Sequence, residues 1–166
     1  MAASTVPVPT GSDNYVLISS VTPVAAASTV SFTSISGYNK LMLRHVDTTL
    51  VTAGTLNVTF NSDTGANYAF SLVGGTTTQD NRQTQKGNNI QFGLATATAQ
   101  LGATYIIDGI TSTGPKPMTG FGSTSGTTVA TMQGVYVATA AITTVTLTTT
   151  TTFSGVGTVA LYGVAA

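Results

Sequence analysis

The chain has 166 residues, only 6% of them charged, and its five basic and five acidic side chains give no net charge at pH 7. This balance lacks the basic surface that nucleic-acid binding needs, and no apolar run is long enough to span a bilayer. The absence of cysteine excludes disulfides and thiolate metal sites. Threonine, at 35 positions, favours strands over helices. The composition predicts one all-β domain with no nucleic-acid or membrane partner.

The charged fraction is far below the roughly 25% of ordinary soluble domains. A free monomer normally carries more charge to stay soluble. The composition therefore indicates a surface that partners cover, or one that hydroxyls and amides hydrate.

The N-terminal segment, residues 1–13, is expected to form an extended arm ahead of a single sandwich domain over residues 14–166. Pro7 and Pro9 remove backbone donors and favour extended backbone, so we interpret them as candidate partner contacts. The segment has neither a basic region nor an apolar region of the secretory type, so we expect no conventional signal peptide.

Short segments of alternating apolar and polar residues follow, separated by turn residues. The predicted strands are 15–19, 28–34, 38–46, 56–60, 67–73, 90–94, 103–110, 127–138, 142–148 and 156–164. Between them we expect a long polar loop over 74–89, a rigid turn over 114–118 and a flexible connection over 121–126. About ten strands at this spacing predict an antiparallel β-sandwich of jelly-roll type.

The predicted loop over 74–89 holds Asp80, Arg82 and Lys86, a large share of the charge in this chain. Loops of this length are uncommon in compact domains and are often functional. Arg82 and Lys86 could hold an acidic partner, or they could merely solvate the loop, and the sequence leaves both alternatives open.

The segment FNSDTGANY has two interpretations. Carboxylate and amide oxygens could bind calcium, although one carboxylate is few for that ion. Alternatively, Asn61 and Asp63 bond local backbone amides, Gly65 takes a positive φ, and the segment closes a hairpin. We favour this structural turn and expect no metal and no cofactor. The turn residues are Asn61, Asp63, Gly65, Asn67 and Tyr68.

Catalytic constellations are not apparent. His45 is the only histidine, and it lies in a predicted strand beside Leu43, where a structural role is expected. The carboxylates Asp47, Asp63 and Asp108 are scattered among predicted strands, so no acid pair for glycoside hydrolysis stands out. We therefore expect a protein that is not an enzyme.

Three motifs taken together resemble a recurrent module of tailed-phage structural proteins. They are GYNKLMLR at 37–44, LNVTFNSDTGANYAF at 56–70, and the final segment at 134–164, with its ITTVTLT strand and its LYG strand. The resemblance implies a jelly-roll sandwich that acts in the virion, after synthesis in the host cytoplasm, without enzymatic activity.

Such modules occur as capsid decoration (cement) proteins and within tail fibres. We expect a decoration protein, a homotrimer whose partners are itself and the major capsid protein or other virion proteins, and which stabilises the head by bridging capsid subunits. The alternative is a tail-fibre or receptor-binding tip domain that contacts host glycans through its 74–89 and 111–126 segments. A glycan-active enzyme is a third, less favoured hypothesis.

Overall fold

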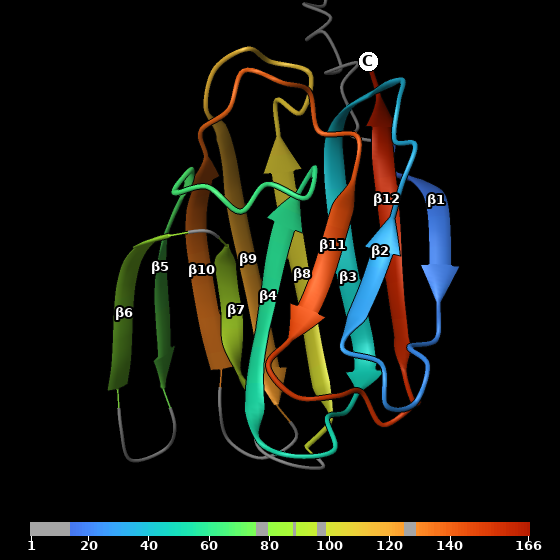
Figure 1. The fold of residues 1–166 in the computed structure, drawn as a ribbon, viewed down its shortest axis with the longest axis vertical. Coiled ribbons are helices and arrows are strands. Elements are labelled where there is room, and N and C mark those ends of the chain that lie inside the picture. Colours follow the sequence, from blue (N-terminus) through green and yellow to red (C-terminus); the bar gives the residue numbers. More distant parts are fainter. Residues whose placement is uncertain (1–13, 76–79, 88, 96–98, 125–128) are drawn as a thin grey trace, which may run out of the picture.

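A computed structural model describes residues 14–75, 80–87, 89–95, 99–124 and 129–166 (Figure 1). Over these residues the protein is all-β, as predicted, and contains no helix. The predicted arm, with Pro7 and Pro9, lies outside the described residues. The strands of this part of the chain are β1 (Val16–Val21), β2 (Thr29–Phe32), β3 (Tyr38–Thr48), β4 (Gly54–Phe60), β5 (Tyr68–Gly75), β6 (Asp80–Gly87), β7 (Ile90–Ala95), β8 (Leu101–Asp108), β9 (Lys116–Thr124), β10 (Val129–Tyr136), β11 (Val145–Thr149) and β12 (Thr158–Ala165).

Eight of these strands form nested antiparallel pairs. β1 pairs with β12, β2 with β11, β3 with β8, and β4 with β7. Successive pairs alternate between two sheets, so the chain behaves as one long hairpin rolled up on itself. This is the jelly-roll arrangement, which confirms the predicted fold class.

The other four strands widen one sheet. β5 and β6 lie between β4 and β7 in the chain, and β9 and β10 lie between β8 and β11. β9 pairs with β8, β10 with β9, β5 with β10, and β6 with β5, so all four strands extend the large sheet beyond β8. The large sheet has the order β1-β12-β3-β8-β9-β10-β5-β6, and the small sheet has the order β2-β11-β4-β7. Figure 1 shows the small sheet in front of the large one, with β5 and β6 extending beyond its edge.

The core lies between the sheets and follows the two-residue period of the strands. In β8 every second side chain is buried, from Leu101 to Ile107, and in β4 Leu56, Val58 and Phe60 face it from the small sheet. Each large apolar side chain buried in this way contributes roughly 1.5–3 kcal/mol. The alternation in the sequence thus fixes which face of each strand is internal.

Three of the predicted connections contain strand residues, which belong to β6 and β9. The expected loop over 74–89 contains β6, which pairs along its length with β5 at the edge of the large sheet. The expected turn over 114–118 and connection over 121–126 are largely replaced by β9. Gly120 of β9 has to be a glycine, because a Cβ at this position would collide with the ring of Tyr105 on the neighbouring strand β8.

His45 lies on the inner face of β3 and is 2% exposed. Its Nδ1 atom is 3.0 Å from the hydroxyl of Thr48, and its ring stacks on Tyr105 with centroids 6.0 Å apart. The Nε2 atom has no hydrogen-bond partner among the described residues. Burial lowers the pKa of His45 to about 4, against a smaller opposing effect of the Leu101 carbonyl.

We predict that this histidine makes folding pH-dependent. Its folded pKa lies below the ordinary 6.5, so the unfolded chain binds a proton first as the pH falls. The free energy of unfolding should decrease by about 3 kcal/mol between pH 6.5 and 4. Urea denaturation across this window measures it. His45→Gln should flatten the profile, and an unchanged slope in that variant would contradict the assignment.

Candidate functional site

The sequence-predicted turn residues lie where the chain crosses from one sheet to the other. β4 ends at Phe60 in the small sheet, and β5 begins at Tyr68 in the large sheet. The predicted hairpin is therefore wrong, because the two strands do not pair. A second crossing, over residues 137–144, leads from β10 back to β11. We call the residues that join these two segments the crossing cluster: Asn61, Asp63, Asn67, Tyr68 and Tyr136.

The carboxylate of Asp63 accepts hydrogen bonds on both oxygens. Oδ1 accepts the backbone N–H of Gly65 at 2.8 Å, and Oδ2 accepts the Asn67 amide at 2.8 Å and the Tyr136 hydroxyl at 2.9 Å. The Asn67 amide first and the Gly65 N–H second hold the pKa of Asp63 below its usual value. Because Asn67 turns a donor toward the carboxylate, the geometry favours the structural turn over a calcium site.

Asn61 ties the first crossing to the second. Its Oδ1 atom accepts the backbone N–H groups of Thr143 and Thr144, at 2.8 and 3.1 Å, and its Nδ2 atom donates to the Ala141 carbonyl at 2.7 Å. We expected Asn61 to bond amides close to it in sequence, and this expectation is wrong. Its partners lie about eighty residues further along the chain.

The backbone of this turn also differs from the expectation. Asn61 and Ser62 have φ values of 54° and 55°, whereas Gly65 does not adopt a positive φ. Asparagine is among the residues that tolerate this left-handed region. Gly65 instead supplies the N–H that Asp63 accepts.

Two stacked tyrosines form the buried side of the cluster. The rings of Tyr68 and Tyr136 are 4.8 Å apart between centroids, and Phe60 packs 5.2 Å from Tyr136. The Tyr68 hydroxyl accepts the backbone N–H of Phe60 at 3.0 Å and lies 3.1 Å from the Asp63 carbonyl. Burial raises the pKa of Tyr68 to about 12 and raises that of Tyr136 as well.

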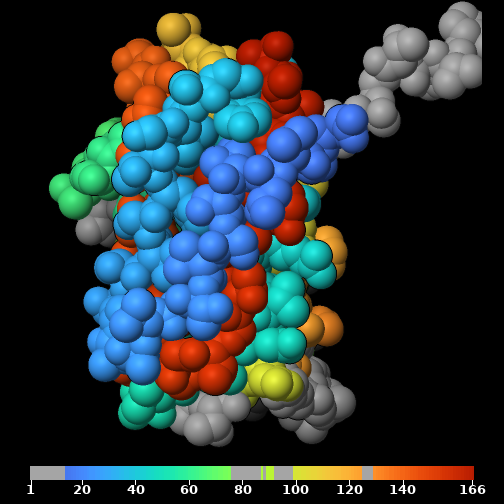
Figure 2. Space-filling model, turned by 90° about the vertical axis from the view of Figure 1, so that its right-hand side faces the viewer, coloured from blue at the N-terminus to red at the C-terminus, as the bar shows by residue number. Residues whose placement is uncertain are grey.

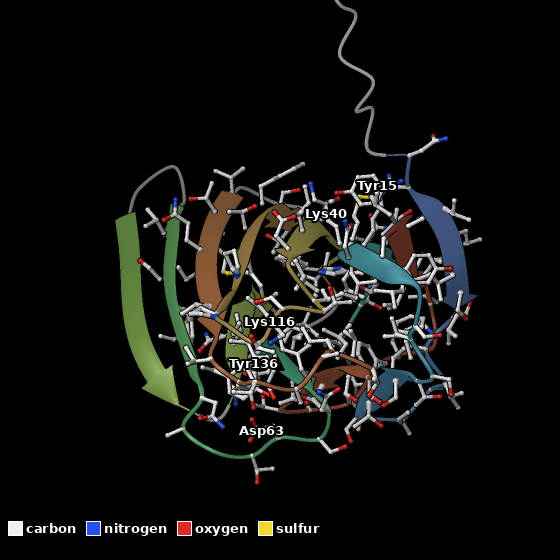
Figure 3. The ribbon with its side chains drawn as sticks, turned by 90° about the horizontal axis from the view of Figure 1, so that it is seen from above. Tyr15, Lys40, Asp63, Lys116 and Tyr136 are labelled. Atoms are coloured by element: carbon white, nitrogen blue, oxygen red, sulfur yellow. The ribbon has the colours of Figure 1, made fainter. Side chains whose placement is uncertain are left out.

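Lys116 is a neighbour of this cluster that the sequence analysis did not identify. Its side chain is buried, and Nζ donates to the carbonyls of Ala138 at 2.6 Å and Gly114 at 3.2 Å. The same nitrogen lies 5.8 Å from the centroid of the Tyr136 ring. Figure 3 labels Lys116, Tyr136 and Asp63 in this part of the molecule. Burial lowers the pKa of Lys116. A lone lysine between two prolines, in GPKP, was the only signal in the sequence.

The remaining candidate residues lie elsewhere. Arg82 and Lys86 belong to β6, where their register partners on β5 are Val73 and Ala69. They are therefore strand residues at the edge of the large sheet and not part of a loop. Within the residues that the structure describes, no three His, Cys, Asp or Glu side chains gather to hold a metal, and no helix is long and apolar enough to cross a membrane.

The outer face of the small sheet is a second candidate site. Every charged residue in the described strands belongs to the large sheet, and none belongs to β2, β4, β7 or β11. Ser31 and Thr146 lie 3.0 Å apart between hydroxyl oxygens, and the Thr148 hydroxyl donates to the Asn57 carbonyl at 3.4 Å. We call the outward residues of this sheet the hydroxyl face: Thr29, Ser31, Asn57, Thr59, Thr146 and Thr148.

Apolar side chains are exposed on the adjacent side of the sandwich. Figure 2 views this side, which β1 and the segments next to it form. Val16 and Leu17 on β1 are 56% and 52% exposed, and Val24 is 72% exposed in the loop that follows. Exposed apolar residues beside an uncharged face are typical of a surface that another protein covers.

In comparisons with known proteins, no family model and no curated protein matches this chain.

We predict that the two tyrosines contribute unequally to stability. Tyr68→Phe leaves the buried N–H of Phe60 without its hydroxyl partner and should cost about 2 kcal/mol. Tyr136→Phe removes one bond to a carboxylate that keeps two other donors, and it should cost about 1 kcal/mol. Urea denaturation of both variants measures this, and a larger loss for Tyr136→Phe would contradict the assigned bonds.

We also predict that calcium does not stabilise the protein. A ligand that binds only the folded state raises the unfolding temperature, and above its dissociation constant the rise grows with the logarithm of ligand concentration. Because the oxygens of Asp63 already accept three donors, thermal unfolding in millimolar calcium and in chelator should coincide. A rise in unfolding temperature that grows with calcium concentration and that Asp63→Asn abolishes would restore the calcium interpretation.

Proposed function

We propose that this protein is a capsid decoration protein of a tailed phage. It is a non-enzymatic virion component that binds the capsid and stabilises it by bridging neighbouring subunits. Two independent observations support the proposal. The motifs at 37–44, 56–70 and 134–164 resemble virion modules, and the strands pair as a jelly roll.

The observation that carries the proposal is the hydroxyl face. Burying an ion without a partner is strongly unfavourable, whereas hydroxyls can be buried once each finds a hydrogen bond. The centres of protein interfaces are depleted in charged residues for this reason. A four-stranded sheet with no charged residue in its described strands is therefore suited to lie against another protein.

The proposed partners are further copies of this chain and the major capsid protein. The resemblance to virion modules implies a homotrimer, a closed symmetric assembly that repeats one contact three times. The mechanism is mechanical: apolar and hydroxyl surface buried across adjacent subunits resists their separation. The protein is made in the host cytoplasm and then resides in the virion.

A tail-fibre or receptor-binding tip domain remains the alternative function. The observation that favours it is Phe121, an aromatic residue that is 67% exposed on the outer face of the large sheet. An exposed aromatic ring is suited to contact a host glycan. The two functions differ in location. Immunogold labelling of purified particles should mark the heads in many copies, and labelling confined to the tail tip would contradict the decoration proposal.

A charged residue on the hydroxyl face should strongly weaken particle binding. Thr59 lies on a central strand of the small sheet and is half-buried, and the matched control Gln133 is exposed on the large sheet. In an interface Thr59→Lys buries an unpaired ammonium, which should weaken binding about a hundredfold or more. Sedimentation with particles produced without the protein measures this. Gln133→Lys should bind normally, and equal loss in both variants would place the contact elsewhere.

A further inference from the structure

The outer face of the large sheet is hollowed where β3, β8, β9, β10 and β5 lie side by side. The hollow has a volume of about 690 Å³, within the range of roughly 300–1,000 Å³ that is typical of small-molecule sites. It lies on the opposite side of the sandwich from the hydroxyl face, so a protein attached through the small sheet leaves it open.

One row of register partners crosses the hollow. In strand order from β3 to β5 the row is Arg44, Thr104, Phe121, Thr131 and Val73. Phe121 is 67% exposed, and a threonine stands beside it on each neighbouring strand. Neighbouring strands are about 4.8 Å apart, so the backbones of Arg44 and Phe121 are about 10 Å apart. An exposed aromatic ring thus has hydroxyls on both sides and a guanidinium within side-chain reach.

The hollow has a positive charge without a balancing carboxylate. Arg44 is exposed, and no aspartate is among the residues that line the hollow. Within the described part of the chain Arg44 makes no ion pair, whereas Lys40 on the same strand pairs with Asp108 at 3.3 Å. A guanidinium is suited to bind a carboxylate through two parallel hydrogen bonds. The charge therefore favours an anionic occupant.

Gly102 keeps the hollow open. A Cβ at this position would meet only the His45 carbonyl, at 4.0 Å, and the backbone there does not need a positive φ. Neither packing nor backbone conformation thus requires a glycine at this point in β8. A glycine inside a strand weakens it, and it often marks a place where a ligand approaches the backbone closely.

We propose that this hollow binds a carboxylated saccharide. The C–H face of a sugar ring lies on Phe121, the sugar hydroxyls bond to Thr104 and Thr131, and the carboxylate pairs with Arg44. Charge complementarity and the size of the hollow carry this choice of ligand. Val73 and Val129, which are 42% and 65% exposed, also line the hollow, so a protein segment is the competing occupant that the test distinguishes. The site is additional to the decoration function and does not depend on it.

The test begins with a printed array of carboxylated glycans, each beside its neutral counterpart, probed with the full labelled chain. The bound glycan that gives the strongest signal is then titrated by calorimetry. We expect binding only to carboxylated glycans. Gly102→Val places a branched side chain in the hollow, above β8, and should weaken binding roughly tenfold or more. Phe121→Ala and Arg44→Gln should each weaken it roughly ten- to hundredfold, the loss that corresponds to one charged hydrogen bond or one ring contact.

Gly87→Val is the matched control, because a Cβ on Gly87 meets nothing within 4 Å and this residue does not line the hollow. It should bind as the unchanged protein does, and urea denaturation checks that all four variants fold. Three outcomes would overturn the proposal: no carboxylated glycan binds, neutral counterparts bind equally well, or Gly102→Val binds normally. A change of oligomeric state in Phe121→Ala would show instead that the hollow contacts protein.

Discussion

Hydrogen bonds join the two chain crossings and hold the two sheets in place at this end of the sandwich. One crossing leaves the small sheet after β4, and the other returns to it before β11. Asn61 bonds the backbone of the second crossing, and Tyr136, at the end of β10, bonds Asp63 in the first. Turn chemistry alone would order each segment separately. Because the bonds run between the segments, they fix the small sheet against the widened part of the large one.

The same arrangement separates two kinds of surface. The small sheet has no charged residue in its described strands, whereas the large sheet has Lys40, Arg44 and Asp108 on its outer face. Covering a surface that has no charged side chains avoids the cost of desolvating ions. A surface with an unpaired cation attracts an anion. The proposed capsid contact and the proposed saccharide site follow from this division, and they can be occupied together because they lie on opposite sides.

The sequence predicted the ten strands in which apolar and polar residues alternate, since that period is the direct consequence of burying one face. It missed β6, because the polar segment of that strand has no such period. It also missed β9, where Gly120 reads as a turn residue but in fact leaves room for the Tyr105 ring. It identified the turn residues of the crossing cluster but not their partners. The distant bonds of Asn61 and the burial of Lys116 depend on the sheet order, which turn composition does not encode.

We propose that the uncharged small sheet is the surface of this protein that is covered in a virion. A cryo-electron microscopy map of the particle would show which surface is covered. We expect the protein in many copies on the head, with β2, β11 and β4 against the capsid and the Phe121 hollow facing solvent. A map that places the protein only at the tail tip, or that leaves the small sheet facing solvent, would contradict it.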